Sequence, residues 1–231
     1  DSCVNCIAAL GHQITYMLQG DMGNGKSATR HMLKKMFPDH RVFYLDCTTK
    51  DVGDLMLPKI MEMNENDQFV RKANKSVQNA LLCLMYERMM GSHTLHPDTI
   101  VYATTNLGAE GVGDLLPPHT RNRMVVLTVK KWTAEQWIGW GISAKPPIDH
   151  NVLLFAKEHP EIFHSFTETP DPESNEYIYH PLVQRAAFTT LRSLENASHI
   201  VKVRDRIGKS ATTASLIGCL GERGGLDLSA Q

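Results

Sequence analysis

The residues best suited to chemistry form one short glycine-rich stretch. It runs Gly20-Asp21-Met22-Gly23-Asn24-Gly25-Lys26-Ser27 and has the spacing Gly-x4-Gly-Lys-Ser. Glycines let the backbone turn its N–H groups inward, a lysine at this position reaches the β- and γ-phosphates of a nucleotide, and the serine hydroxyl ligates Mg²⁺. The spacing therefore predicts a phosphate-binding loop for a magnesium nucleotide.

The segments on either side of this stretch fit that prediction. Residues 14–18 are apolar and rich in strand-forming residues, and residues 28–37 have the apolar spacing of a helix. A loop between a strand and a helix places phosphates at the helix N-terminus, where free N–H groups and a partial positive charge favour anions. Ser27 is the predicted metal ligand, and the predicted nucleotide-binding residues are Gly20, Asp21, Met22, Gly23, Asn24, Gly25, Lys26, Ser27 and Ala28.

Further short runs predict the rest of a parallel sheet. Residues 41–46, 99–106 and 124–129 are rich in β-branched and aromatic residues, and the second run ends in the amide of Asn106. Residues 75–88 have the spacing of an amphipathic helix, and residues 89–98 resemble a hairpin or loop. Strands that alternate with helices imply right-handed parallel crossovers.

After about residue 130 the β-branched runs vanish. Predicted helices follow at residues 133–140, 149–159, 185–203 and 211–219, whereas residues 206–210 are expected to form a loop. Three tryptophans, Trp132, Trp137 and Trp140, are spaced so that Trp140 shares a helical face with each of the others. We expect residues 1–130 to form an α/β nucleotide-binding core and residues 131–231 a small all-helical domain.

The composition limits the classes of partner. The chain has 24 Lys and Arg against 25 Asp and Glu, so a net charge of −1 gives no global reason to bind nucleic acid or an anionic membrane. No apolar run approaches the roughly 20 residues of a membrane span. Five scattered cysteines suit reduced thiols, which favours a cytoplasmic protein. Cys3 and Cys6 have the spacing of zinc ligands, but no second ligand pair accompanies them.

Taken in order, these segments resemble the AAA+ ATPases, and among them the MoxR-like branch. Residues 73–88 are similar to the family helix with the pattern V-Q-x-A-L-L-x-x-M-x-E-R, and residues 99–106 resemble the sensor 1 strand, which ends in A-T-x-N. Arg123, just before the next strand, matches the arginine finger, with Arg121 as the alternative. Thr190-Leu191-Arg192 resembles the sensor 2 motif, although Leu191 replaces its usual proline.

The resemblance implies a P-loop NTPase αβα sandwich with a parallel sheet, followed by a helical lid, and it implies ATP and Mg²⁺ as cofactors. Asn106 would hold the attacking water, and Arg192 would sense the γ-phosphate and couple hydrolysis to lid rotation. Arg123 would stabilise the transition state in a neighbouring subunit. A hexameric ring that remodels or activates a protein partner is therefore expected, and in this family the partner often carries a von Willebrand factor A domain. A nucleic-acid motor or loader is the alternative, which the near-neutral charge disfavours.

One departure from the family concerns the Walker B strand. The family has an apolar strand ending in Asp-Glu just before the helix of residues 75–88, where the Asp positions Mg²⁺ and the Glu activates water. Residues 64–72 contain neither an apolar strand nor an Asp-Glu pair. We infer that a segment is missing from this sequence between about Asp67 and Arg71. If the chain is continuous there, the expected protein is a nucleotide-binding scaffold without hydrolysis.

Overall fold

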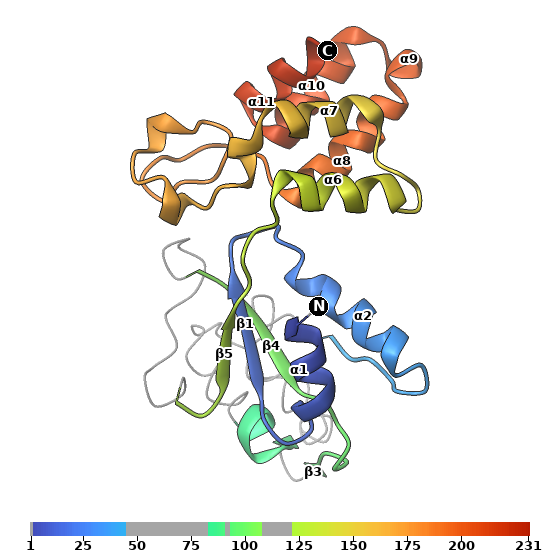
Figure 1. Cartoon of the computed structure of the whole chain (residues 1–231), viewed down its shortest axis with the longest axis vertical. Coiled ribbons are helices and arrows are strands. Elements are labelled where there is room, and N and C mark those ends of the chain that lie inside the picture. The colour runs from blue at the N-terminus through green and yellow to red at the C-terminus, as the bar shows by residue number, and fades with distance from the viewer. Residues whose placement is uncertain (1, 45–82, 91–92, 108–121) are drawn as a thin grey trace, which may run out of the picture. The chain divides into compact units, whose positions relative to one another are not determined.

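The computed structural model of the chain describes residues 2–44, 83–90, 93–107 and 122–231 (Figure 1). These residues belong to two compact units. The first holds described residues 2–19, 27–44, 83–90, 93–107 and 122–128, and the second holds residues 20–26 and 129–231. The predicted Walker B junction at residues 67–71, most of the predicted helix of residues 75–88, and Arg121 lie outside the described residues.

The described strands of the first unit form a three-stranded parallel sheet in the order β4-β1-β5. Strand β1 pairs with β5 in a register that runs from Tyr16↔Val125 to Gln19↔Thr128. Tyr16, Met17 and Leu18 are buried, which explains why this apolar run forms the central strand. The sheet confirms an α/β fold in kind, and its strands are β1 (Tyr16–Gly20), β4 (Tyr102–Asn106) and β5 (Val125–Thr128).

Two α-helices of the first unit are α1 (Ser2–Leu10) and α2 (Thr29–Met36). Helix α2 lies within the predicted helix of residues 28–37 and follows a 3₁₀ turn, η1 (Lys26–Ala28). Helix α1 contains Cys3 and Cys6, and it buries Val4 and Ile7. Among the described residues, no cluster of three or more His, Cys, Asp or Glu side chains could hold a metal ion.

The predicted strand at residues 41–46 is wrong where the structure describes it. Residues 41–44 form no strand and are exposed, with 88% of Phe43 open to solvent. Aromatic and β-branched residues favour a strand only where they can pair with a neighbouring strand and bury their side chains in a core. Tyr44 instead lies under the guanidinium of Arg30, 5.2 Å from its ring centroid.

The described end of the predicted helix at residues 75–88 is a short π-helical turn, η2 (Cys83–Glu87). Arg88 has a left-handed φ of 57°, which ends the turn one residue earlier than predicted. Its guanidinium donates hydrogen bonds to the carbonyls of Gly11 (3.0 Å) and Thr99 (3.3 Å), and burial lowers its pKa. The antiparallel strands β2 (Met89–Met90) and β3 (His93–Thr94) follow, which confirms the predicted hairpin.

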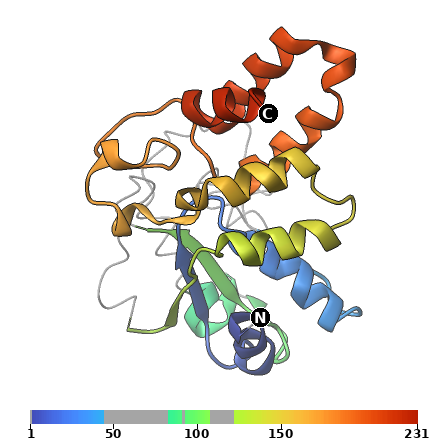
Figure 2. The same ribbon diagram turned by 45° about the horizontal axis from the view of Figure 1, so that its top comes forward.

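The second unit is built from helices around one apolar core. Helix α6 packs on α7, and α10 packs on both α8 and α11 (Figures 1 and 2). Trp137, Phe155 and Leu194 lie at the centre of this core and are almost completely buried. No described helix is both long and apolar enough to cross a membrane. The helices are α6 (Ala134–Ser143), α7 (His150–Glu158), α8 (Leu191–Lys202), α9 (Arg204–Ile207), α10 (Lys209–Leu220) and α11 (Glu222–Ser229).

The predicted helices of this unit are confirmed except at two places. The helix expected at residues 185–203 begins only at Leu191, because the Thr190 side chain accepts from the Ser193 N–H and caps it there. Residues 206–210 are largely helical, and the break falls at Gly208 alone, which has a left-handed φ of 81°. The single glycine is enough to separate α9 from α10.

The tryptophan prediction is confirmed for Trp137 and Trp140, which both lie on α6, whereas Trp132 lies just before this helix. The Trp140 ring contacts the rings of Trp132 and Trp137, with centroids 6.1 and 6.3 Å apart. Trp137 is 1% exposed and also contacts Phe163, at 6.0 Å. Trp137 therefore belongs to the helical core, whereas Trp132 and Trp140 are each 37% exposed.

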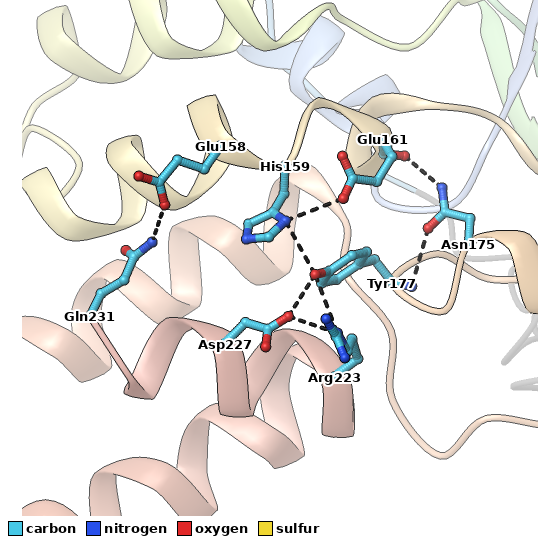
Figure 3. Close-up of polar contacts among 8 residues, drawn as sticks. All are labelled: Glu158, His159, Glu161, Asn175, Tyr177, Arg223, Asp227 and Gln231. Atoms are coloured by element: carbon cyan, nitrogen blue, oxygen red, sulfur yellow. Dashed lines mark hydrogen bonds and ion pairs between the residues drawn. The ribbon is translucent and has the colours of Figure 1, made fainter.

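A polar cluster joins the connection between α7 and α8 to the last helix (Figure 3). The Tyr177 hydroxyl donates to Asp227 Oδ2 at 2.6 Å, and Arg223 Nε lies 2.8 Å from the same oxygen. His159 Nδ1 lies 3.2 Å from both the Tyr177 hydroxyl and Glu161 Oε1. Burial raises the pKa of the Tyr177 phenol. The connection includes the 3₁₀ turns η4 (Pro160–Phe163), η5 (Phe166–Glu168) and η6 (Pro172–Ser174).

Candidate functional site

The predicted phosphate loop leaves β1 at Gly20 and enters the turn η1 at Lys26. Gly23 and Gly25 have φ angles of 68° and 72°, in the left-handed region that favours glycine. A Cβ atom built on Gly25 would meet no atom within 4 Å, so there is open space at this point of the loop. Gly25 is a fixed glycine of the motif and Gly23 occupies one of its variable positions, and both adopt a backbone conformation that other residues resist.

Lys26 is only 8% exposed, and its side chain folds back over the loop. Its Nζ donates hydrogen bonds to the carbonyls of Gly20 and Asp21, both at 2.7 Å. A buried ammonium group requires such partners because desolvation without them is costly. The Lys26 ammonium group therefore lies against the backbone of the loop itself. A phosphate group bound there could replace the neutral carbonyls of Gly20 and Asp21 as its hydrogen-bond partners.

The start of the loop is anchored by Val129. A Cβ atom built on Gly20 would lie 2.7 Å from the Val129 carbonyl oxygen, so only glycine fits there without a shift. The same carbonyl accepts a 3.1 Å hydrogen bond from Asn24 Nδ2. Asn24 Oδ1 is buried and, in the part of the chain that the structure describes, has no hydrogen-bond partner. Val129 thus holds the loop at two points.

The middle of the loop touches the beginning of α8. A Cβ atom built on Gly23 would lie 2.6 Å from the Thr190 Cβ. Thr190 is the residue that caps α8, and Arg192 is the second residue of that helix. Arg192 is exposed, and no described residue makes a hydrogen bond or ion pair with it. The structure therefore brings the helix start that carries the predicted sensor arginine to the predicted phosphate loop.

Asp21 is held by a residue that the sequence did not single out. Its Oδ1 accepts a 2.9 Å hydrogen bond from the Ser165 hydroxyl, 144 positions later in the chain. The pattern Ser165-x-x-Glu168 is a capping-box signal that could have been recognised in the sequence. Its pairing with the loop could not, because no local pattern relates residues so far apart.

The remaining predicted residues lie in the first unit. Ser27 and Ala28 are exposed residues of η1, directly before α2. Asn106 is half-buried and ends β4, the neighbour of β1. Parallel strands place their carboxyl ends at one edge of a sheet, so Asn106 lies at the same edge of the sheet as the carboxyl end of β1.

Arg123 precedes β5 and so lies at the opposite edge of the sheet. The four paired residues between β1 and β5 separate the two edges by about 13 Å at 3.3 Å per residue. Arg123 is exposed, and its guanidinium lies 4.8 Å from the centroid of the Tyr86 ring. The structure thus separates Arg123 from the edge that carries Asn106.

Comparisons with protein-family models, curated proteins and solved structures found no match to this chain.

Proposed function

We propose that the chain is a Mg²⁺-dependent ATP hydrolase of the AAA+ type, similar to the MoxR-like branch, whose subunits assemble as a hexameric ring. The observation that carries the proposal is the packing of Gly23 against Thr190 at the start of the helix with Arg192. A loop of nucleotide-binding sequence thereby lies against the start of a helix whose second residue is cationic, and a γ-phosphate sensor would need a cation near such a loop.

The geometry of the loop fits a bound nucleotide. Two left-handed glycines, a buried lysine and a following helical turn are the elements that cradle phosphate groups. Lys26 would exchange its two backbone partners for the β- and γ-phosphates, and Ser27, which is exposed, would ligate Mg²⁺. The Mg²⁺ ion would neutralise part of the negative charge on the phosphates.

The remaining groups have complementary roles in the proposal. Asn106, at the loop edge of the sheet, would orient the attacking water. Arg123, at the edge of the sheet opposite Asn106, would act on the nucleotide of a neighbouring subunit. The exposed position of Arg123 is compatible with the ring that the resemblance implies. The ring would remodel or activate a protein partner, which in this family often carries a von Willebrand factor A domain.

A second candidate function rests on one observation, the lack of an Asp-Glu pair in residues 64–72. Without those carboxylates the loop would bind Mg²⁺-nucleotide but not hydrolyse it. The chain would then act as a nucleotide-dependent scaffold.

Phosphate release from Mg²⁺-ATP separates the two candidates. A hydrolase releases phosphate in the wild type, and both Lys26→Ala and Asn106→Ala abolish this release. A scaffold binds ATP without releasing phosphate. Analytical ultracentrifugation with and without ATP tests the ring, since a species that stays monomeric with bound ATP contradicts it. Indifference of the turnover to added DNA and RNA would support a protein partner over the motor alternative.

A further inference from the structure

The bond between Asp21 and Ser165 links the phosphate loop to the irregular connection that follows α7. Both side chains are almost completely buried, at 8% and 9% exposure. Their atoms Oδ1 and Oγ are 2.9 Å apart. A hydrogen bond from a hydroxyl to a carboxylate in a buried site is stronger than one between neutral groups, and losing its donor leaves the carboxylate poorly solvated.

Neighbouring groups fix the direction of the Ser165 hydroxyl. Its oxygen accepts from the Thr167 N–H at 3.3 Å and from the Thr167 hydroxyl at 3.0 Å. The Glu168 carboxylate accepts from the Ser165 N–H at 3.0 Å, which completes the capping box of η5. Because the acceptor sites of Oγ are used within the turn, its one proton is directed to Asp21.

The Asp21 side chain and the Lys26 ammonium act on the same short piece of backbone. The Asp21 carbonyl accepts from Lys26 Nζ, while the Asp21 carboxylate is held by Ser165. The hydrogen bond from Ser165 also turns one oxygen of the negatively charged Asp21 carboxylate toward the connection between α7 and α8. A carboxylate left free in this loop would repel phosphate groups.

We propose that Ser165 is a positioning residue for the phosphate loop: through Asp21 it fixes the loop backbone and keeps the carboxylate turned away from the phosphates of the nucleotide. This inference rests on the proposed nucleotide binding. If it is correct, the affinity for nucleotide phosphates depends on the segment between α7 and α8, although that segment carries no nucleotide-binding motif.

The test is a set of binding titrations on the full chain with Mg²⁺-ADP and Mg²⁺-ATP. Ser165→Ala should weaken both affinities about tenfold, as expected for a lost hydrogen bond to a charged group. Ser165→Gly should do the same, and it keeps the turn competent because glycine costs little at a capping position. Ser165→Thr, which retains a hydroxyl, should restore the affinity.

Thr169→Ala is the matched control. The Thr169 hydroxyl donates to the Ser165 carbonyl at 2.9 Å in the same turn, so its loss disturbs the turn but not the bond to Asp21. This variant should bind both nucleotides within about twofold of the wild type. Equal weakening by Thr169→Ala and Ser165→Ala would overturn the inference, because the effect would then come from the turn as a whole.

A double-mutant cycle distinguishes positioning from general stability. In an Asp21→Ala background, Ser165→Ala should have no further effect on nucleotide affinity, since its partner is already gone. Additive effects in the cycle would overturn the inference. If the wild type binds nucleotide and both Ser165→Ala and Ser165→Gly bind it equally well, the inference alone is wrong. If the wild type binds neither nucleotide, the proposed function fails and the inference fails with it.

Discussion

Thr190 caps helix α8 and also lies against Gly23 of the predicted phosphate loop. Its side-chain oxygen accepts from the Ser193 N–H at 3.1 Å, and its Cβ would be 2.6 Å from a Cβ built on Gly23. One side chain therefore sets both the start of the helix that carries Arg192 and the space allowed to the loop. A substitution at Gly23 must move either the loop or the helix start.

Gly23→Ala should destabilise the second unit by more than Gly25→Ala. Both substitutions place a side chain at a positive φ, which costs about 1 kcal/mol. Only the alanine at position 23 also collides with Thr190, whereas the one at position 25 meets open space. Urea unfolding followed by tryptophan fluorescence measures the difference, because all three tryptophans lie in this unit. Equal losses of unfolding free energy would show that the contact with Thr190 is unimportant.

Arg123→Ala should abolish ATP turnover while leaving nucleotide affinity nearly unchanged. Arg123 lies at the sheet edge opposite Asn106, and in the proposed ring it would serve a neighbouring subunit. Mixing this variant with Lys26→Ala should restore part of the activity, since an interface in which the Arg123→Ala subunit supplies the loop and the Lys26→Ala subunit supplies the arginine has both groups intact. A phosphate-release assay on the mixtures measures the rescue.

Tyr86→Ala is the control for Arg123. It removes the ring beneath the guanidinium but keeps the guanidinium itself, so turnover should persist. Loss of turnover in Tyr86→Ala together with no rescue in the mixed samples would contradict a role for Arg123 across a subunit interface.

Tyr177→Phe should lower the unfolding free energy by about 1 to 2 kcal/mol, because it removes a partly buried hydrogen bond from the Tyr177 hydroxyl to Asp227. Tyr179→Phe is the matched control in the same segment, where the ring packs on Phe166 and Phe188. It should change the unfolding free energy by less.

The pH dependence of the Tyr177 effect has a definite sign. Burial raises the pKa of Tyr177, so the folded state favours its neutral form. The stability that this group contributes is present below the ordinary phenol pKa of about 10 and is lost as the pH rises through the higher folded value. The difference in unfolding free energy between the wild type and Tyr177→Phe, measured by urea unfolding, should become smaller above pH 10. A larger difference would contradict a raised pKa of Tyr177 in the folded state.

Local patterns predicted the parts of the fold that depend on local chemistry. The strand of residues 14–18, the loop and the helix of residues 28–37 follow from periodicity and glycine spacing, and the structure has β1, the loop and α2 there. The same reasoning failed for residues 41–44, where composition favours a strand but no described neighbour pairs with it. Whether a strand forms depends on its pairing with the other strands of the sheet, and the composition of one short run of residues does not determine that pairing.

The contacts that shape the loop could not be predicted in the same way. Three residues, Val129, Ser165 and Thr190, contact it from roughly 100 to 170 positions later in the chain. Ser165 lies in a recognisable capping box and Thr190 in a segment that resembles sensor 2, but neither pattern predicts a contact with the loop. Their roles depend on how the helical unit folds around the loop. The glycines at positions 20 and 23 carry part of this information, since each is tightly enclosed by one of these partners.

Calorimetric titration of the wild type and Lys26→Ala with Mg²⁺-ATP tests the central claim most directly. Lys26 is the buried cation of the loop, and alanine removes the charge that would meet the phosphates while its two carbonyl partners remain. Saturable binding to the wild type, with heat that disappears in Lys26→Ala, is the predicted result. Either no binding to the wild type or equal affinity in the two proteins would contradict a phosphate site at this loop.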